Sequence, residues 1–173
     1  MQVNVAQLLK ASIGVEKVYK VDEDIEIEGQ DVRVTGDVKL IRTDRGILAK
    51  GNLATELEIE CSRCLEPYLY PVKVKFEEEY FPTIDVLSGL PVEVPEEQPV
   101  YFTIDESHII DLDEAIRQYA LLAIPMKPLC KEDCAGICPG CGENLNLKTC
   151  KCLPDTKDTR IAGLNKKLTE SEK

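Results

Sequence analysis

Residues 32–64 read VRVTGDVKLIRTDRGILAKGNLATELEIECSRC, and this stretch decides the fold. Apolar and polar residues alternate along it on both sides of a Thr-Asp-Arg-Gly turn at 43–46. Alternation with a period of two is typical of a strand that buries one face, and threonine, aspartate and glycine favour turns. The stretch therefore predicts a half-buried antiparallel hairpin whose second strand carries glutamates on its outer face.

The segments around this hairpin extend the pattern. Residues 16–28 favour an extended segment, and residues 68–77 alternate again and favour a third strong strand. A short helix is expected at 5–11. A longer helix is expected near 111–124, where Asp111 takes the N-cap role ahead of Glu114 and an apolar stripe follows. We therefore predict an α+β fold, with a mainly antiparallel β-sheet or partly open barrel and one packed helix.

Charge divides the chain, whose net charge is −11, into two parts. Residues 1–125 hold 12 Lys and Arg against 25 Asp and Glu, a balance of −13, whereas residues 126–173 hold 9 against 7, a balance of +2. We expect an acidic β-rich domain at 1–125 and a cysteine-rich segment with a tail helix at 126–173. The acidic part either serves only to keep the protein soluble or attracts a basic protein partner, and charge alone does not distinguish the two; binding to a phosphate backbone would need clustered cations. RNA would have to contact the lysines of the second part, which are Lys127, Lys131, Lys148 and Lys151.

Eight cysteines are the strongest chemical signal. They fall into a pair at the end of the hairpin stretch and a group of six beyond the predicted helix: Cys61, Cys64, Cys130, Cys134, Cys138, Cys141, Cys150 and Cys152. Eight thiols with a single histidine suit two four-sulfur sites, and a two-residue gap lets two thiolates hold one ion from a single turn. We predict that all eight are zinc ligands and that 126–173 contains a zinc knuckle.

Two arrangements of these thiols are compatible with the spacing. In the first, Cys138 and Cys141 share a site with the two last cysteines, and Cys61 and Cys64 share one with Cys130 and Cys134. In the second, Cys130 and Cys134 combine with Cys138 and Cys141, and the outer two pairs combine with each other. In either arrangement one site joins two distant parts of the chain, with Cys61 and Cys64 in the connection between two strands.

Other uses of the thiols are less consistent with the sequence. Disulfides belong to oxidising compartments, and the N-terminal residues show no leader pattern, so we expect a cytoplasmic protein with reduced thiols. No stretch approaches the roughly 20 apolar residues of a membrane-spanning helix, so no membrane association is expected. The spacings match neither common ferredoxin pattern, which leaves an iron–sulfur cluster or a thiol-based redox role as the alternative to zinc.

Enzymatic residues do not stand out. His108 is the only histidine and lies beside two isoleucines, with no nucleophile signature around it. No glycine-rich phosphate loop is present, and no carboxylate pair is distinguished from the other acids. We therefore expect a protein that is not an enzyme and has no small-molecule substrate.

The cysteine pattern as a whole resembles a known family. A CxxC turn after an alternating strand, followed by CxxxCxGxCPxCGxNLN and CxC, is similar to the YceD family of large ribosomal RNA subunit accumulation proteins. The residues that carry the resemblance are the eight cysteines with Gly136, Pro139, Gly142, Asn144, Leu145 and Asn146.

The resemblance implies a non-catalytic ribosome-biogenesis factor that supports accumulation of large-subunit ribosomal RNA. Its partner would be a ribosomal protein or the large-subunit ribosomal RNA of a pre-ribosomal particle. The zinc sites would then be structural, because closed four-sulfur sites usually are. We further expect Asn144 and Asn146 to form hydrogen bonds with backbone or thiolate groups around the metal.

Overall fold

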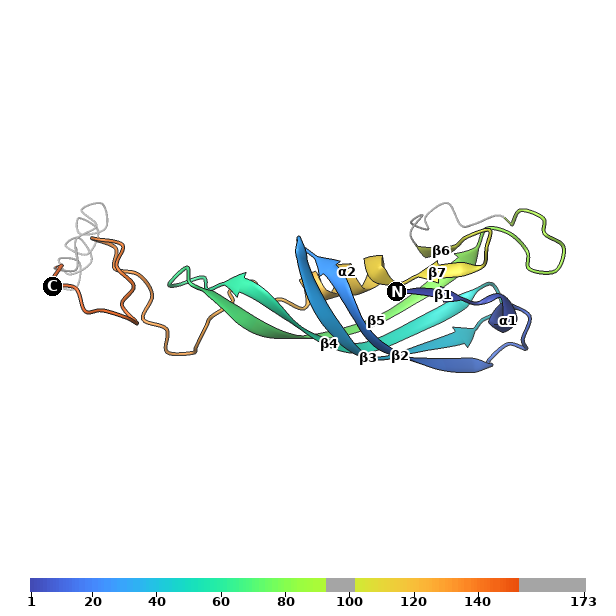
Figure 1. The fold of residues 1–173 in the computed structure, drawn as a ribbon, viewed down its shortest axis with the longest axis horizontal. Helices are drawn as coiled ribbons and strands as arrows, with labels where there is room; N and C mark the ends of the chain where they lie inside the picture. The colour runs from blue at the N-terminus through green and yellow to red at the C-terminus, as the bar shows by residue number, and fades with distance from the viewer. Residues whose placement is uncertain (93–101, 153–173) are drawn as a thin grey trace, which may run out of the picture. The chain divides into compact units, whose positions relative to one another are not determined.

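The chain folds into two compact units, and the computed structural model describes residues 1–92 and 102–152 of them (Figure 1). The first unit comprises residues 1–59 and 69–126; the second comprises residues 60–68 and the chain from residue 127 onward. The predicted boundary after residue 125 did not include residues 60–68 in the second unit. They belong there because Cys61 and Cys64 lie beside Cys130 and Cys134. The tail helix expected within 153–173 lies outside the described residues.

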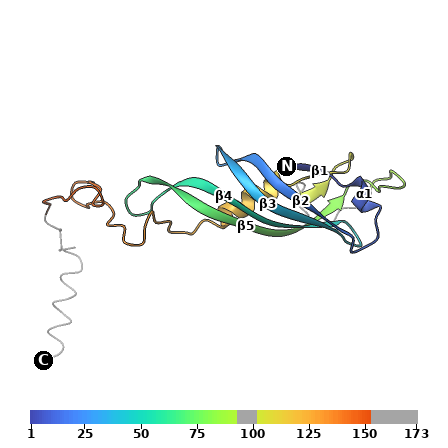
Figure 2. The ribbon, with the colours of Figure 1, turned by 60° about the horizontal axis from the view of Figure 1, so that its bottom comes forward.

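Strands dominate the described residues, as the prediction of an α+β fold with a mainly antiparallel sheet required. The elements are β1 (Gln2–Asn4), α1 (Ala6–Leu9), β2 (Glu16–Ile27), β3 (Gln30–Arg42), β4 (Ile47–Glu60), β5 (Pro67–Pro82), β6 (Thr103–Ile104), β7 (Ile109–Asp111) and α2 (Asp113–Leu122). A five-stranded sheet has the order β2-β3-β4-β5-β6, and a separate two-stranded sheet pairs β1 with β7. The larger sheet is curled (Figures 1 and 2).

The predicted hairpin is present as β3 and β4, with antiparallel register from Thr35↔Ala54 to Arg42↔Ile47. Its turn closes where the N–H of Thr43 donates to the carbonyl oxygen of Gly46. A second hairpin joins β2 to β3 through two residues, Glu28 and Gly29, with φ of 51° and 75°. Positive φ at both positions is the signature of a type I′ turn, whose twist matches that of the strands it joins.

One face of the five-stranded sheet forms the core of the first unit. Its buried side chains occupy alternate positions of four strands, as the period of two predicted. They are Val21, Ile25 and Ile27 of β2, Val32, Val34, Val38 and Leu40 of β3, Ile47, Ala49, Leu53 and Leu57 of β4, and Val72, Val74, Phe76 and Tyr80 of β5. The opposite face carries exposed charged side chains, so the sheet has one dry and one wet face.

Helix α2 is shorter than predicted, and its start differs. Asp111 belongs to β7, and Leu112 takes the N-cap position, so Asp111 does not cap the helix in the manner expected. It still accepts a hydrogen bond from the N–H of Asp113 at 3.0 Å. Pairing with β1 explains the difference, because Asp111 lies opposite Gln2 in that ladder, which sequence spacing could not show.

The buried face of α2 is as the apolar stripe predicted. Ala115, Ile116 and Ala120 are fully buried, and the helix packs against β2. Within the described residues no helix has both the length and the apolar character needed to cross a bilayer. The first unit therefore consists of a curled sheet with one packed helix.

Candidate metal centres

The eight cysteine sulfurs gather into two groups of four, both in the second unit. Centre I contains Cys61, Cys64, Cys130 and Cys134, and centre II contains Cys138, Cys141, Cys150 and Cys152. Within each centre all four sulfur atoms lie within 4.8 Å of one another. This grouping is the first of the two arrangements that the spacing allowed, and all eight thiols are free rather than joined as disulfides.

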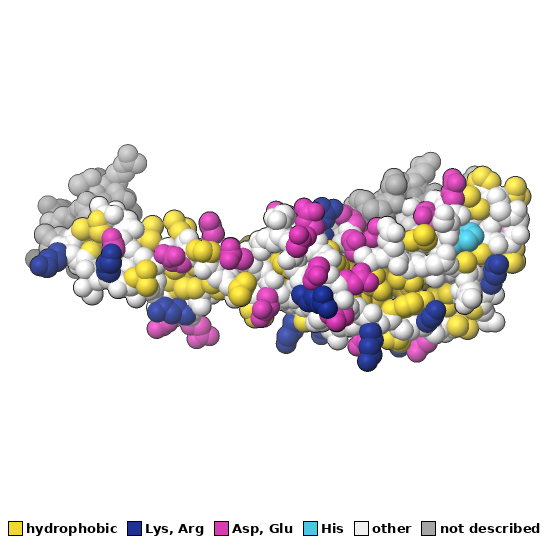
Figure 3. All heavy atoms as spheres, viewed as in Figure 1, with side chains coloured by type: hydrophobic (Ala, Val, Ile, Leu, Met, Phe, Trp, Pro, Cys, Tyr) yellow, Lys and Arg dark blue, Asp and Glu magenta, His cyan; other side chains and the backbone are white. Residues whose placement is uncertain are grey.

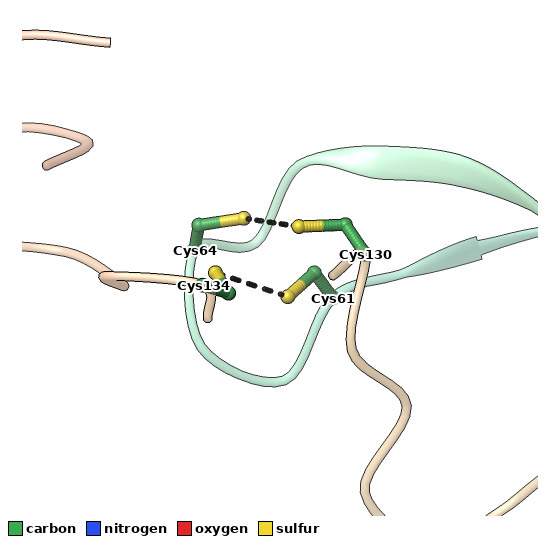
Figure 4. Close-up of side chains that lie close together, drawn as sticks. All are labelled: Cys61, Cys64, Cys130 and Cys134. Atoms are coloured by element: carbon green, nitrogen blue, oxygen red, sulfur yellow. Dashed lines mark hydrogen bonds between the residues drawn. The ribbon is translucent and has the colours of Figure 1, made fainter. Parts of the chain in front are cut away.

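The geometry of centre I fits a tetrahedral ion. The four side chains point toward one another from two segments of the chain (Figure 4). The Sγ atoms of Cys61 and Cys134 are 3.7 Å apart, as are those of Cys64 and Cys130. A tetrahedron with zinc–sulfur bonds of about 2.3 Å has sulfur–sulfur edges of about 3.8 Å. The donor set and its dimensions therefore suit zinc, with every ligand position filled by sulfur.

Knuckle A, residues 61–66, supplies two of these sulfurs from a closed turn. The N–H of Leu65 donates to the carbonyl oxygen of Cys61 at 2.9 Å, and the N–H of Cys61 donates to that of Glu66 at 3.0 Å. Leu65 has a φ of 60°, a left-handed conformation that a leucine rarely adopts. The turn reverses the chain between β4 and β5 and brings both sulfurs to one side.

Knuckle B, residues 138–143, has the same backbone hydrogen bonds. The N–H of Gly142 donates to the carbonyl oxygen of Cys138 at 2.8 Å, and the N–H of Cys138 donates to that of Glu143 at 2.8 Å. Gly142 has a φ of 74° at the position that Leu65 holds in knuckle A, and glycine adopts it without strain. The two knuckles thus share a C-x-x-C-x-E sequence and one turn geometry. This correspondence was not predicted from the sequence, although the shared sequence motif could have indicated it.

Hydrogen bonds attach knuckle A to the distant segment that completes centre I. The N–H of Ser62 donates to the carbonyl oxygen of Pro128 at 2.8 Å. The Arg63 guanidinium donates to the carbonyl oxygen of Cys134 at 3.0 Å, and the Arg63 carbonyl accepts from the N–H of Ile137 at 3.1 Å. The connection is therefore made by backbone groups of both segments as well as by the thiols.

Asn146 and Asn144 form hydrogen bonds with thiol and backbone groups near centre I, as expected. The Asn146 side-chain amide donates to the Cys134 sulfur at 3.3 Å, and its carbonyl oxygen accepts from the N–H of Ala135 at 2.9 Å. Asn144 accepts from both the N–H and the side-chain amide of Asn146 at 2.9 Å, and it donates to the carboxylate of Glu66 at 3.2 Å. These contacts link the chain after knuckle B to centre I and to knuckle A.

Centre II is more exposed than centre I. Cys141 and Cys152 are exposed and Cys150 is partly exposed, whereas only Cys138 is buried. In centre I three of the four thiols are buried, and the partly buried Tyr68, Leu129 and Cys130 pack against them. Centre I is therefore the interior of the second unit, and centre II lies at its surface.

The pKa values of the thiols differ within each centre. Burial raises the pKa of Cys61, but backbone N–H groups, that of Cys130 foremost, lower it to about 6. Burial, reinforced by the hydrogen bond to Cys134, raises the pKa of Cys130 to about 12. Neighbouring thiols therefore do not all ionise together. A divalent cation allows all four thiolates to form, because it offsets their mutual repulsion.

Centre II shows the same division. A hydrogen bond from Cys150 and backbone N–H groups lower the pKa of Cys138 to about 6. The hydrogen bond and negative charge of Cys141 raise the pKa of Cys152 to about 12. Both centres are therefore consistent with binding of a thiophilic divalent cation, and the four groups in each centre are all thiols.

The remaining residues singled out in the sequence lie outside these centres. His108 is in the first unit, between β6 and β7, where its carbonyl oxygen accepts from the N–H of Val5 at 2.8 Å. The four lysines considered for RNA contact, Lys127, Lys131, Lys148 and Lys151, are exposed in the second unit. Lys148 forms an ion pair with Glu143 of knuckle B at 3.2 Å.

Comparison with known proteins identifies a family that this chain matches. A family model described as "Large ribosomal RNA subunit accumulation protein YceD" matches residues 49–167. The match therefore begins in β4, before knuckle A, and includes both centres. No solved structure matches the chain.

Individual relatives are found in bacteria and in a plant. An uncharacterized protein of Mycobacterium tuberculosis is 35% identical over 106 residues, which are 61% of this chain and 48% of that protein. A protein of Arabidopsis thaliana named large ribosomal RNA subunit accumulation protein YCED homolog 1, chloroplastic, is 28% identical over 159 residues, 76% of this chain and 46% of that protein. The chain thus spans about half the length of the relatives it matches.

Proposed function

The chain belongs to the YceD family, and from this premise we propose that it is a non-catalytic factor that supports accumulation of large-subunit ribosomal RNA. The family description and the name of the plant relative support a ribosome-related role. In the proposal, zinc occupies both centres and maintains the fold of the second unit. Free thiols fit a reducing compartment, so the proposed location is the cytoplasm.

The pair of four-sulfur centres carries this proposal. A catalytic zinc keeps one position open for water or substrate, whereas each centre here supplies four thiols. The second unit has a small apolar interior, formed chiefly by Cys61, Cys64 and Cys134 with three neighbours. Such an interior buries too little surface to fold alone, so metal binding supplies its folding free energy. A metal-stabilised binding surface fits these features better than an active site.

The proposed partner is a ribosomal protein or the large-subunit ribosomal RNA. Residues 1–125 carry a balance of −13 and repel a phosphate backbone, while they attract basic proteins. In the second unit the exposed Lys127, Lys131 and Lys151 offer cations near the centres. A protein contact through the first unit and an RNA contact through the second are therefore the two forms the proposal takes.

The proposal is tested by depletion in cells that make the protein. We expect large-subunit ribosomal RNA to fall relative to small-subunit RNA, measured by quantitative RNA analysis and by subunit profiles on sucrose gradients. Re-expression of the natural chain should restore the ratio, and re-expression with Cys61→Ser should not. A His108→Ala chain is the matched control and should restore it, because His108 lies outside both centres. An unchanged ratio after depletion would contradict the proposed function.

A further inference from the structure

The five-stranded sheet of the first unit opens between β3 and β4. Their ladder ends at Thr35 and Ala54, although β3 begins at Gln30 and β4 continues at least to Ile59 within this unit. β3 stays paired with β2 as far as Gln30, and β4 lies beside β5. The β2–β3 hairpin and the β4–β5 pair therefore diverge, which both ribbon views show (Figures 1 and 2).

Side chains rather than a ladder cross this opening. The Gln30 amide group donates to the Glu58 carbonyl oxygen at 2.9 Å and accepts from the Glu58 N–H at 3.0 Å. The Thr55 hydroxyl donates to the carbonyl oxygen of Arg33 at 2.9 Å. Glu56 lies two positions before Glu58, so its N–H and carbonyl face the same edge, and the ladder does not reach them. The backbone N–H and carbonyl groups of β4 at Glu56 therefore face the opening.

The opening is a groove of about 630 Å³. Buried Val32 and Val72 contribute to its lining, and Leu69, whose side chain is 64% exposed, adds an apolar surface at one wall. Ala54 lines the groove where the ladder ends. Apolar side chains in the lining, placed between two strand edges, suit an extended chain, whose side chains alternate between the groove and solvent.

Acidic side chains surround the groove. The outer face of the diverging strands carries six carboxylates against two cations: Asp22, Asp24, Glu26, Asp31, Glu56 and Glu58 against Arg33 and Lys73. Arg33 is already paired with Asp22 at 2.7 Å and with Asp24 at 3.5 Å. Acidic side chains gather around the β2–β3 hairpin in the space-filling view (Figure 3). The charge therefore selects a cationic occupant and disfavours a nucleic acid.

We propose that this groove binds an extended basic segment of a partner protein, with apolar residues toward Val32 and Leu69 and lysine or arginine residues toward Glu56 and Glu58. Backbone groups at Glu56 would form strand-like hydrogen bonds with the segment, as in recognition by strand addition. The inference rests on the proposed function, because it specifies the partner as a protein and places its contact in the first unit.

The test is fluorescence anisotropy with the full-length, zinc-loaded chain and a short labelled peptide of alternating lysine and valine. Glu56→Gln combined with Glu58→Gln is expected to weaken binding about tenfold, and Ala54→Arg, which fills the groove and adds a cation, by a similar factor. Raising the salt concentration should weaken binding by the natural chain more than binding by the double variant.

Two matched variants distinguish binding in the groove from a general effect of charge on binding. Asn52→Arg adds the same cation two residues away on the same face of β4, and Asp37→Asn removes one exposed carboxylate from β3 beyond the groove. Both should change binding less than about twofold. Thermal melting and zinc content verify that each variant is folded.

Three results would overturn the inference. They are equal weakening by Asn52→Arg and Ala54→Arg, equal binding of a peptide with glutamate in place of lysine, and direct binding of a labelled uridine-rich RNA oligonucleotide that is as tight as binding of the basic peptide. None of them bears on whether depletion lowers large-subunit RNA, so this inference and the proposed function can fail separately.

Discussion

Centres I and II have the same chemistry and the same knuckle, yet they hold together different amounts of structure. Centre I joins residues 61–64 to residues 130–134, across a gap of 66 positions between Cys64 and Cys130. Centre II takes all its thiols from residues 138–152 and leaves two of them exposed. The two knuckles therefore indicate that the position of a cysteine pair in the chain, rather than its local sequence, decides how much of the chain a centre brings together.

Loss of centre I should have the largest effect. Replacing Cys61 and Cys134 together by serine removes two of its ligands and should lower the zinc content from about two ions per chain to one or none. Residues 60–68 and 127–152 should lose amide-exchange protection, while β2 and β3 keep theirs, because these strands contain no ligand. Elemental analysis and hydrogen exchange measure both effects. Retention of protection at 127–137 would show that centre I does not organise the unit.

Loss of centre II should have a smaller effect. Cys138→Ser with Cys141→Ser should leave about one zinc ion and should expose residues 138–152 to exchange. Residues 61–66 should stay protected, because Ser62 and Arg63 keep their contacts with Pro128 and Cys134. Loss of protection in knuckle A would contradict this expectation and would show that centre I depends on centre II. A brown protein with visible absorbance would instead indicate an iron–sulfur cluster.

The rate of metal release should also distinguish the centres. A competing chelator should remove zinc from centre II about tenfold faster than from centre I, because Cys141 and Cys152 are exposed whereas Cys61 and Cys64 are buried. Release is followed with a zinc-sensitive dye. The Cys138→Ser, Cys141→Ser variant serves as the control and should show only the slow phase. Two equal rates in the natural chain would contradict the prediction.

Asn146 should contribute a moderate stabilisation that is specific to centre I. Asn146→Ala removes hydrogen bonds to the Cys134 sulfur and to the N–H of Ala135. Hydrogen bonds to a charged acceptor contribute about 2 kcal/mol, so the free energy of unfolding of the second unit should fall by about that amount. Chemical denaturation, monitored by the hydrogen exchange of residues 130–137, measures this change in the free energy of unfolding. Lys148→Ala, which removes an exposed ion pair with Glu143, is the control and should change little.

The smallest effects on stability are expected from substitutions at the equivalent left-handed positions of the two knuckles. Gly142→Ala should destabilise knuckle B by about 1 kcal/mol through its left-handed backbone alone, since a Cβ there meets no atom within 4 Å. Leu65→Gly should stabilise knuckle A by about 0.5 kcal/mol, because relief of the strain at φ 60° exceeds the entropic cost of glycine. Thermal melting of the zinc-loaded variants measures both changes. Changes of the same sign would contradict a shared turn geometry.

Much of the first unit could be predicted because its signal is local. Val34, Val38 and Leu57 alternate with polar neighbours, and a period of two specifies a strand with one buried face in any context. Strand β1 and its partner β7 escaped prediction, because three residues carry too little periodicity and Val3 meets Ile110 only in the folded chain. The start of α2 was predicted wrongly for the same reason, since the β1–β7 ladder, which forms only in the folded chain, includes Asp111.

For the candidate site, the donor chemistry followed from the sequence alone: eight thiols, two of their pairs spaced for knuckles, and a single histidine. Only the tertiary structure decided which pairs meet, because spacing constrains a turn but not the partner of that turn across a long loop. Tertiary structure also decided that centre I is interior and centre II is exposed. The groove between β3 and β4 is also a feature of the tertiary structure, because alternation in the sequence specifies which face of a strand is buried but not where two strands diverge.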